Sequence, residues 1–406
     1  MEATSATGAG EEPEQEGAMV QTAPRPETAT RAAAEADVYA ELGLTPVINA
    51  RGNQTVLGGA LLSPRILAAM EAANRYFVDM DALLAQTGRL AAELIGCEAA
   101  YVTPGCAAAM ALGAAACIAG DDGAKMERLP DTAGMKREIV IQARQRYKYD
   151  RCPTIVGAVL REAGDAQGTT PQQLEATIGP DTAAVLFPAH LERRDGTVPL
   201  PEVIAIAHRR GVPVLVDAAS QIYPIERLRG WTKMGADLVC FGAKYWGAPH
   251  SSGLLCGRRD LVASAAQQGF IGFEHSPYRT FGRPLKLDRG EILAVVLALR
   301  EWVTMDHAAR IARVQARVDA VIGQLNGLPG VAATSVPGVH FGAPGLRVRL
   351  DSASRRNAEG LVRALREGSP SIWAYHDAES VAFNLTTVAE GDETIIAGRL
   401  RELLGG

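Results

Sequence analysis

Long apolar runs are missing from this sequence. The stretch ALGAAACIAG at 111–120 is among the most apolar, yet it is too short and too rich in glycine and alanine to cross a bilayer, which takes about 20 consecutive apolar residues. The start, MEATSATGAGEEPEQEG, lacks the basic and apolar regions of a secretory signal. Both absences argue against a membrane-spanning or exported protein and predict a cytoplasmic one.

Paired cysteines and clustered basic residues are scarce as well. The formal net charge is -5 and no Lys/Arg cluster stands out, which argues against nucleic acid as a partner and leaves small molecules. No CxxC pair occurs, so we expect neither a bound metal nor a disulfide framework. We expect the cysteines to be buried small apolar side chains; they are Cys97, Cys106, Cys117, Cys152, Cys240 and Cys256.

The chain is long enough for two or three domains. It has 406 residues, of which 47% are hydrophobic and 21% charged, as in ordinary globular proteins. Residues 1–36 have almost no large apolar side chains and are predicted to be a disordered tail. We expect a large domain at 37–285, which includes an N-terminal leading segment at 41–59, and a smaller α+β domain at 286–406.

The large domain shows the pattern of an α/β fold. A helix is predicted after Ser63, a suitable cap, with Pro64 in its first turn. Its buried face is expected to hold Ile66, Leu67, Met70 and Ala73. From residue 100 onward, short apolar runs alternate with amphipathic segments, which predicts a mostly parallel, doubly wound sheet covered by helices. The predicted strands are AAYVT, EIVIQ, AAVLFP, PVLVDAA, DLVCFGAK and GLLCG.

The pattern changes after Pro284. A long helical stretch is predicted at about 289–325, followed by short strands at GLRVRL and VAFNL. The helix RRNAEGLVRALREG lies between these strands, and another helix ends the chain. This order is typical of a small α+β domain.

Two charged residues mark the ends of neighbouring predicted strands. PVLVDAA brings Asp217 to the carboxyl end of a buried strand, and DLVCFGAK brings Lys244 there about one helical crossover later. Pyridoxal phosphate (PLP) chemistry needs both groups: a lysine amine to form a Schiff base, and a carboxylate to keep the pyridine nitrogen protonated. We therefore predict a PLP site with Lys244 as the catalytic residue and Asp217 and Ala219 beside the cofactor.

A phosphate cradle is predicted at VTPGCAAAM. A strand end, a glycine turn and a helix start would direct the backbone N–H groups of Gly105, Cys106 and Ala107 at an anion. The Cys106 side chain is expected to be passive, with contact to the phosphate as the alternative.

His190 follows another strand, and two interpretations stay open: a cofactor contact or acid/base group, and an ordinary loop histidine.

The sequence resembles the selenocysteine synthase-like group of fold-type I PLP enzymes, especially its D-glucosaminate-6-phosphate ammonia-lyase-like members. The resemblance spans about residues 42–310 and implies the aspartate aminotransferase fold, a homodimer or higher assembly of dimers, and Schiff-base catalysis by lysine. It rests on blocks that include GNQTVLGGALLSP, FVDMDALLAQTG, EAAYVTPGCAAAMAL, LPDTAGMKREIVIQ, TVPLPEVIAIAHRRGVPVLVDAA and GRPLKLDRGEI.

Two departures from the family pattern fall at the predicted site. Relatives of the lyase type read QRGHR where this chain has QARQR, so Gln145 replaces the imidazole expected to stack on the pyridine ring. Relatives read FSGGK where this chain has FGAKYWGAPHSSG, without the serine expected to contact the phosphate. Tyr245, Trp246 and His250 are therefore candidates for an altered substrate pocket.

Several basic residues are candidates for the substrate's anionic groups. Arg283 and Lys286 match basic positions of the family, with a salt bridge at a domain hinge as the alternative for them. Arg347 lies where fold-type I enzymes often keep a carboxylate-binding arginine, although strand alternation also explains it. Further candidates are Arg51 and Asn53 in the leading segment, and His275 and Tyr278 in a loop suited to cover the site.

These features predict an enzyme acting on an amino acid or amino sugar acid. The substrate would join PLP as an external aldimine, lose its α-proton to the freed Lys244 amine and then a β-substituent, which makes a lyase that yields a 2-oxo acid. A racemase or epimerase and an aminotransferase share the early steps and remain alternatives. A tRNA-dependent selenium transferase is disfavoured by the net negative charge, and a non-catalytic relative stays open because of the two departures.

Overall fold

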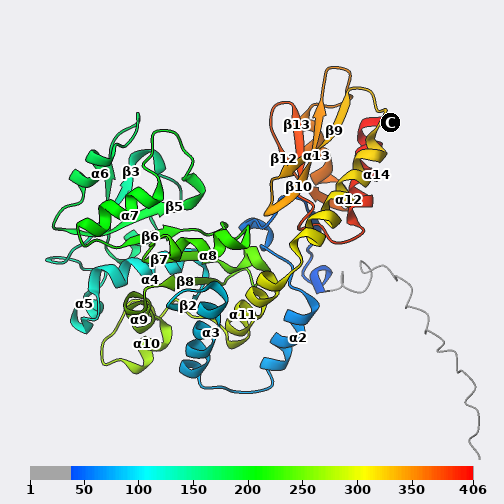
Figure 1. Cartoon of the computed structure of the whole chain (residues 1–406). Helices are drawn as coiled ribbons and strands as arrows, with labels where there is room; N and C mark the ends of the chain where they lie inside the picture. The colour runs from blue at the N-terminus through cyan, green and yellow to red at the C-terminus, as the bar shows by residue number, and fades with distance from the viewer. Residues whose placement is uncertain (1–37, 406) are drawn as a thin grey trace, which may run out of the picture. The chain divides into compact units, whose positions relative to one another are not determined.

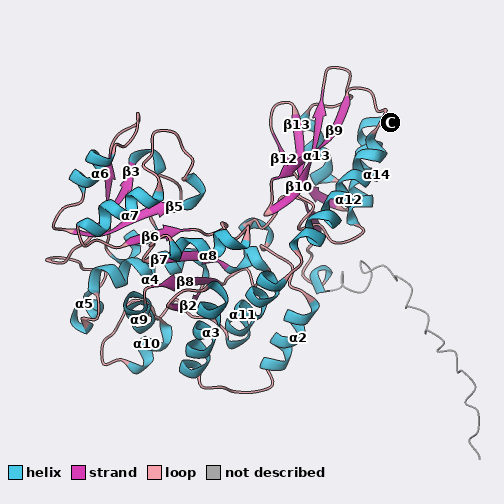
Figure 2. Cartoon of the chain, viewed as in Figure 1, coloured by secondary structure: helices cyan, strands magenta, loops and turns pink. Residues whose placement is uncertain are grey.

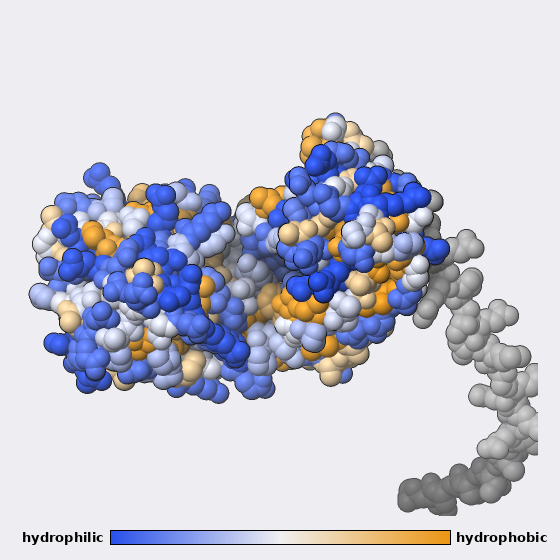
Figure 3. Space-filling model, turned by 90° about the horizontal axis from the view of Figure 1, so that it is seen from above, coloured by the Kyte–Doolittle hydropathy of each residue, from blue (hydrophilic) through white to orange (hydrophobic). Residues whose placement is uncertain are grey.

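The computed structural model describes residues 38–405, so the predicted tail at 1–36 lies outside the described residues. Residues 48–405 belong to one unit, and the contacts below lie within it. Strands form two separate groups bordered by helices (Figures 1 and 2). Hydrophilic residues dominate the surface seen in Figure 3, with apolar residues scattered among them. None of the helices in the described part of the chain is long and apolar enough to span a membrane.

The larger group is a seven-stranded sheet in the order β2-β8-β7-β6-β5-β3-β4. Strands β3 to β7 pair in parallel where they are neighbours, whereas β8 is antiparallel to both β7 and β2. The mostly parallel sheet is therefore confirmed. The strands are β2 (Ala99–Thr103), β3 (Glu138–Gln142), β4 (Val159–Ala163), β5 (Thr182–Pro188), β6 (Val214–Asp217), β7 (Leu238–Gly242) and β8 (Gly253–Gly257).

Helix α4 (Gly105–Ala119) is the centre of the first core, because its small side chains let it lie close against the sheet. A Cβ at Gly113 would contact the side chains of Leu215, Leu238 and Leu255, which come from three adjacent strands. The other helices around this core are α2 (Pro64–Ala73), α3 (Met80–Ile95), α5 (Gly123–Arg128), α6 (Pro171–Thr177), α7 (Leu200–Arg209), α8 (Ile225–Lys233), α9 (Arg259–Gln267), α10 (Phe270–His275) and α11 (Arg289–Thr304).

Short 3₁₀ turns follow several strands and carry residues of the predicted site. They are η1 (Thr55–Leu57), η2 (Ala143–Gln145), η3 (Cys152–Val156), η4 (Ala189–Leu191) and η5 (Ala243–Trp246). The sequence suggested that Lys244 is the last residue of its strand. In the structure β7 ends at Gly242, so Lys244 lies just beyond the strand, in η5.

The second group of strands is an antiparallel sheet in the order β12-β13-β10-β9. Its core is separate from the first and includes Val318, Leu361 and Ile396. Its elements are α12 (His307–Leu325), β9 (Val331–Gly338), β10 (Gly342–Leu350), α13 (Ala358–Glu367), β12 (Tyr375–His376), β13 (Ser380–Phe383) and α14 (Asp392–Gly405), with the short strands β1 (Val47–Asn49) and β11 (Ser371–Trp373) outside this sheet.

The two cores meet along the chain between Trp302, which packs in the first, and Val314, which packs in the second. The domain boundary at 285/286 stays a prediction. The helical stretch expected at about 289–325 consists of two helices: the chain leaves helical geometry at Met305, and the Asp306 carboxylate caps the next helix by accepting from the Ala309 N–H at 2.9 Å. This break positions the start of α12.

The predicted cap of α2 is confirmed, since Ser63 Oγ accepts from the Ile66 N–H at 3.3 Å. The predicted buried face is only partly right. Ile66 is fully buried, but the side chain of Leu67 is 53% exposed because it turns away from the core.

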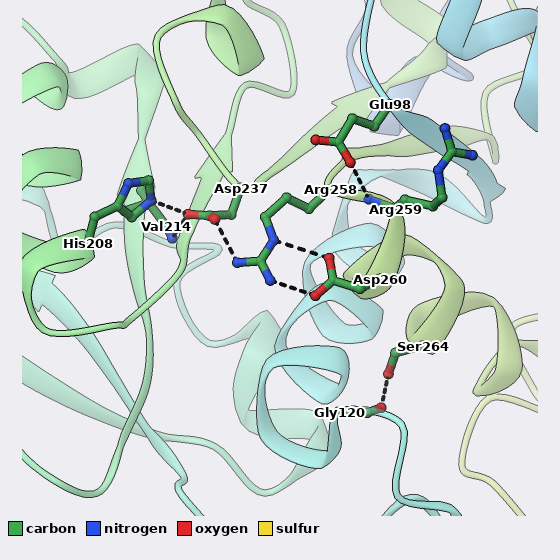
Figure 4. A network of polar contacts seen from close by, with 9 residues as sticks. All are labelled: Glu98, Gly120, His208, Val214, Asp237, Arg258, Arg259, Asp260 and Ser264. Carbon is green, nitrogen blue, oxygen red and sulfur yellow. Dashed lines mark hydrogen bonds and ion pairs between the residues drawn. The ribbon is translucent and has the colours of Figure 1, made fainter.

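A polar network ties the amino ends of the central strands (Figure 4). Asp237, just before β7, accepts from the Val214 N–H at 2.8 Å, contacts His208 Nε2 at 2.8 Å and pairs with Arg258 at 3.0 Å. The network fixes β6 and β7 at the edge opposite to the one where Asp217 lies. It therefore stabilises the frame from which the site projects.

Candidate active site

The structure brings Asp217 to the carboxyl end of β6, next to β7 and the η5 turn that carries Lys244. Ligands of open α/β sheets bind at this edge. The Asp217 side chain is only 4% exposed, so its charge needs partners within the protein. Lys244 is half-buried.

Three donors surround the Asp217 carboxylate. Oδ1 accepts from the Ala219 N–H at 3.0 Å and from the Cys106 thiol at 3.4 Å, and Oδ2 accepts from the phenol of Tyr147. Burial, followed by the charge of Asp217, raises the pKa of the Cys106 thiol, so this thiol stays protonated and donates. Ala219 and Cys106 thus lie where the sequence suggested, but the Cys106 side chain is not passive.

Tyr147 is a site residue that the sequence reasoning missed. Burial and the nearby Asp217 charge raise the pKa of its phenol, which therefore remains a donor. Its ring lies 5.0 Å from the ring of His190, whose pKa is lowered by desolvation. Gln145 is instead fully buried and bonds with Gln142 at 3.1 Å. The structure thus brings Tyr147, two residues further along, beside Asp217.

Lys244 lies beside the leading segment. Its Nζ donates to Thr55 Oγ1 at 3.1 Å, and its carbonyl accepts from Asn53 Nδ2 at 3.1 Å. Burial lowers the pKa of the Lys244 amine, which increases the neutral, nucleophilic fraction near pH 7. Asn53 thus contacts the turn that carries Lys244. The guanidinium of Arg51 lies elsewhere, 4.5 Å over the ring of Tyr375.

The turn before α4 is suited to an anion. Gly105 has φ +84°, and Pro104 at the N-cap provides no side-chain acceptor, so the first N–H groups of the helix remain available, including those of Cys106 and Ala107. A Cβ at Gly253 would lie 2.4 Å from the Gly105 carbonyl carbon, so β8 approaches this turn closely. The cradle, the buried carboxylate and the half-buried amine fit the phosphate, ring and aldehyde of PLP.

The residues after Lys244 have different roles. The Tyr245 ring packs 5.9 Å from Phe341, and burial raises the pKa of its phenol to about 12. Trp246 is buried and its Nε1 donates to the Val295 carbonyl at 3.3 Å, so it holds η5 against α11. His250 Nδ1 is buried without a hydrogen-bond partner among the described residues, and burial together with the Lys244 charge lowers its pKa.

A cavity of about 380 Å³ opens beside these residues. Its lining combines the leading segment, η5, the end of α11, the start of α12 and the loop after β13. Among the lining residues are Asn53, Lys244, Tyr245, Trp302, Arg310, Arg317, Phe341 and Thr386.

The other predicted substrate residues lie outside this cavity. Arg283 pairs with Glu274 at 2.7 Å, and Lys286 is exposed. Arg347 is exposed on β10, opposite Ala382. The structure does not bring these three cations to Lys244 of the same chain.

The two loop residues also have partners of their own. His275 contacts Asp81 at 2.5 Å. The ring of Tyr278 lies so close to Gly123 that a Cβ there would clash with it. Within one chain, these contacts hold the loop against α3 and α5.

Comparison with known proteins agrees with this geometry. Residues 132–324 match the sequence profile described as Aminotransferase class-V. The chain is 35% identical over 382 residues to the 5'-C-glycyluridine monooxygenase-decarboxylase of a Streptomyces species, covering 90% of this chain and 92% of that protein. It is 31% identical over 377 residues to the D-glucosaminate-6-phosphate ammonia lyase of Salmonella typhimurium, covering 90% and 98%.

A solved structure gives the same picture. The structure of D-glucosaminate-6-phosphate ammonia-lyase superposes with a TM-score of 0.81 at 29% identity, covering 90% of this chain and 97% of that one. The L-seryl-tRNA(Sec) selenium transferase of Moorella thermoacetica is 28% identical over 426 residues, covering 91% and 84%. The aminotransferase-like fold therefore extends over most of the chain.

Proposed function

Because the chain belongs to the selenocysteine synthase-like group of fold-type I PLP-dependent enzymes, we propose that it is a lyase acting on an amino acid or amino sugar acid. PLP is its cofactor, as in the ammonia lyase and aminotransferase relatives. One observation carries the proposal: Asp217 and Lys244 lie at one edge of the sheet in a chain that matches 98% of the length of an ammonia lyase.

In this proposal Lys244 holds the cofactor's aldehyde carbon, Asp217 its ring nitrogen, and the backbone of Gly105, Cys106 and Ala107 its phosphate. Bound PLP supplies an electron sink for the substrate's α-carbon. Tyr245 and Asn53, which line the cavity, bind substrate, and His250 is assigned the same role from its place in the sequence after Lys244. Trp246 contributes by holding η5 in place.

Lys244 moves the proton in this reaction. Its amine, made less basic by burial, accepts the α-proton of the substrate, and the β-substituent leaves with its bonding electrons. Water then releases ammonia, so a β-hydroxy amino acid gives one 2-oxo acid and one ammonia. Neutral His190 and the Tyr147 phenol keep the surroundings of Asp217 uncharged, which preserves the attraction of its carboxylate for a protonated ring nitrogen.

An assay of the purified PLP-loaded enzyme tests the lyase. We expect equal amounts of ammonia and 2-oxo acid from at least one member of a panel of β-hydroxy amino acids and amino sugar acids. Entry of solvent deuterium at the α-position without release of ammonia would indicate a racemase or epimerase instead of a lyase. Accumulation of the pyridoxamine form with an amino donor would indicate an aminotransferase.

A second candidate is an oxygen-dependent decarboxylase. It is favoured by the 35% identity to the monooxygenase-decarboxylase, which is higher than the 31% identity to the ammonia lyase. The two reactions differ in their co-substrate and product, because only the decarboxylase consumes O₂ and releases CO₂. If product formation stops when O₂ is removed, the protein is an oxygen-dependent decarboxylase and not a lyase.

We also propose that two copies associate through the surface between residues 56 and 78. Large apolar side chains are exposed along this segment, and an interface between two copies would remove them from water. The exposed fractions are 96% for Phe77, 76% for Leu61, 73% for Val56 and 70% for Tyr76.

The variant Phe77→Ser tests this surface. We expect at least about a tenfold weaker dimer, because removal of a central aromatic side chain commonly costs an interface ~1.4 kcal/mol or more. Sedimentation of the wild type and the variant over a dilution series measures the change. Ile155→Ser is the matched control, since Ile155 is 63% exposed at a different site. Equal dimerisation of the wild type and the Phe77 variant would contradict the proposed surface.

A further inference from the structure

Arg310 lines the same cavity as Lys244 and Tyr245, on the first turns of α12. Among the described residues 38–405, no carboxylate is paired with it. Its guanidinium is half-buried, and a charge that is partly removed from water without a counter-charge is costly to the protein. An anion bound in the cavity would offset that cost.

Neutral groups hold the guanidinium in place. Its Nε donates to His307 Nδ1 at 3.1 Å, and Nη2 donates to the Phe341 carbonyl. His307 Nε2 lies 2.9 Å from the Trp302 carbonyl, so the ring carries its proton on Nε2 and accepts at Nδ1. Burial lowers the pKa of His307, which keeps this acceptor neutral.

Aromatic rings flank the same guanidinium. Its carbon lies 5.1 Å from the centre of the Trp302 ring and 5.3 Å from that of Tyr223. Phe341, whose carbonyl it binds, has φ +50°, the only positive value among non-glycine residues in the described part of the chain. Such backbone strain is typical of functional sites, and here it directs the carbonyl at Arg310 while the ring packs against Tyr245.

The neighbouring arginine of the cavity is already occupied. Arg317 pairs with Glu393 at 2.7 Å and donates to the carbonyls of Leu385 and Val388 at 3.1 Å each. Arg310 has five N–H donors, of which two are used by His307 and Phe341. The remaining donors lie on Nη1 and Nη2, the fork that binds a carboxylate through both of its oxygens.

We propose that Arg310 binds the carboxylate of the substrate. The inference rests on the proposed function, because it gives an amino acid-type substrate its anchor in the cavity beside Lys244. It assigns to Arg310 the role that the sequence suggested for Arg283, Lys286 or Arg347. The site selects substrates that carry a free carboxylate over the corresponding amides or esters.

Calorimetric titration of the PLP-loaded enzyme with acetate tests this assignment. We expect acetate to bind the wild type and to bind Arg310→Gln at least about tenfold more weakly, because a charge-assisted bidentate contact is lost. Arg313→Gln is the matched control, since it removes an equal charge from an exposed position one turn along α12. Acetamide is the neutral control ligand and is expected to distinguish none of these proteins.

Arg310→Lys covers the case in which the glutamine variant does not fold. It keeps the charge but loses the fork, so several-fold weaker acetate binding is expected. The inference is overturned if wild type fails to bind acetate, if Arg310 variants bind it equally well, or if only inorganic phosphate shows the Arg310 dependence. The visible band of bound PLP is recorded in parallel: a band in both proteins together with equal acetate affinities of wild type and Arg310→Gln defeats this inference alone, whereas no band in wild type defeats the proposed function.

Discussion

Lys244→Ala is expected to abolish the visible absorption band of the lysine–PLP Schiff base and to lower turnover at least about 1,000-fold. The amine is the group that joins the cofactor and then accepts the substrate's proton, and no other lysine of the described residues lines the cavity. Absorption spectra of the purified proteins with added PLP, together with ammonia release, measure both effects.

The loss should be chemical and not structural. Within residues 38–405, Lys244 Nζ makes one hydrogen bond, to Thr55, so we expect its removal to change the melting temperature little. Lys233→Ala, at an exposed position on α8, is the matched control and should keep both the band and the activity. A Lys244→Ala protein that keeps the band would show that another amine holds the cofactor.

The frame of the site could be predicted because its signals are local. Parallel strands buried on both faces read as apolar runs, and β5, β6 and β7 were found in this way. The position of Asp217 follows directly from the end of such a run. Strand β4 was missed because four of its five residues are not fully buried, so VLREA has no continuous apolar pattern.

The lining of the cavity could not be predicted because it joins distant segments. Tyr147 reaches Asp217 across 70 positions of sequence, and Arg310 reaches Phe341 across 31. Neither pair has a spacing that a helix or hairpin explains. Arg283 and Lys286 were chosen by resemblance, and resemblance alone does not show which side chain turns toward the cavity in one chain.

The break at Met305 shows how a small local feature sets the chemistry. In a continuous helix over 289–325, Arg310 would lie on the same helix axis as α11. The Asp306 cap instead starts α12 afresh, and His307 then bonds back to the Trp302 carbonyl. The aromatic and carbonyl partners of Arg310 therefore depend on this break.

Asp217→Asn is expected to lower kcat/KM about 100-fold or more while the fold is retained. The amide keeps the shape and can still accept from the Ala219 N–H, but it has no negative charge to hold a protonated pyridine nitrogen.

Tyr147→Phe removes one donor from the carboxylate and leaves its charge, so we expect only a several-fold loss of kcat/KM and a shift in the absorption of bound PLP. Spectra, PLP affinity and kcat/KM of both variants measure this order. If kcat/KM falls as far in Tyr147→Phe as in Asp217→Asn, the phenol acts on the substrate itself. If Asp217→Asn keeps the wild-type rate, the carboxylate does not act on the cofactor, because this substitution removes the charge and keeps the shape of the side chain.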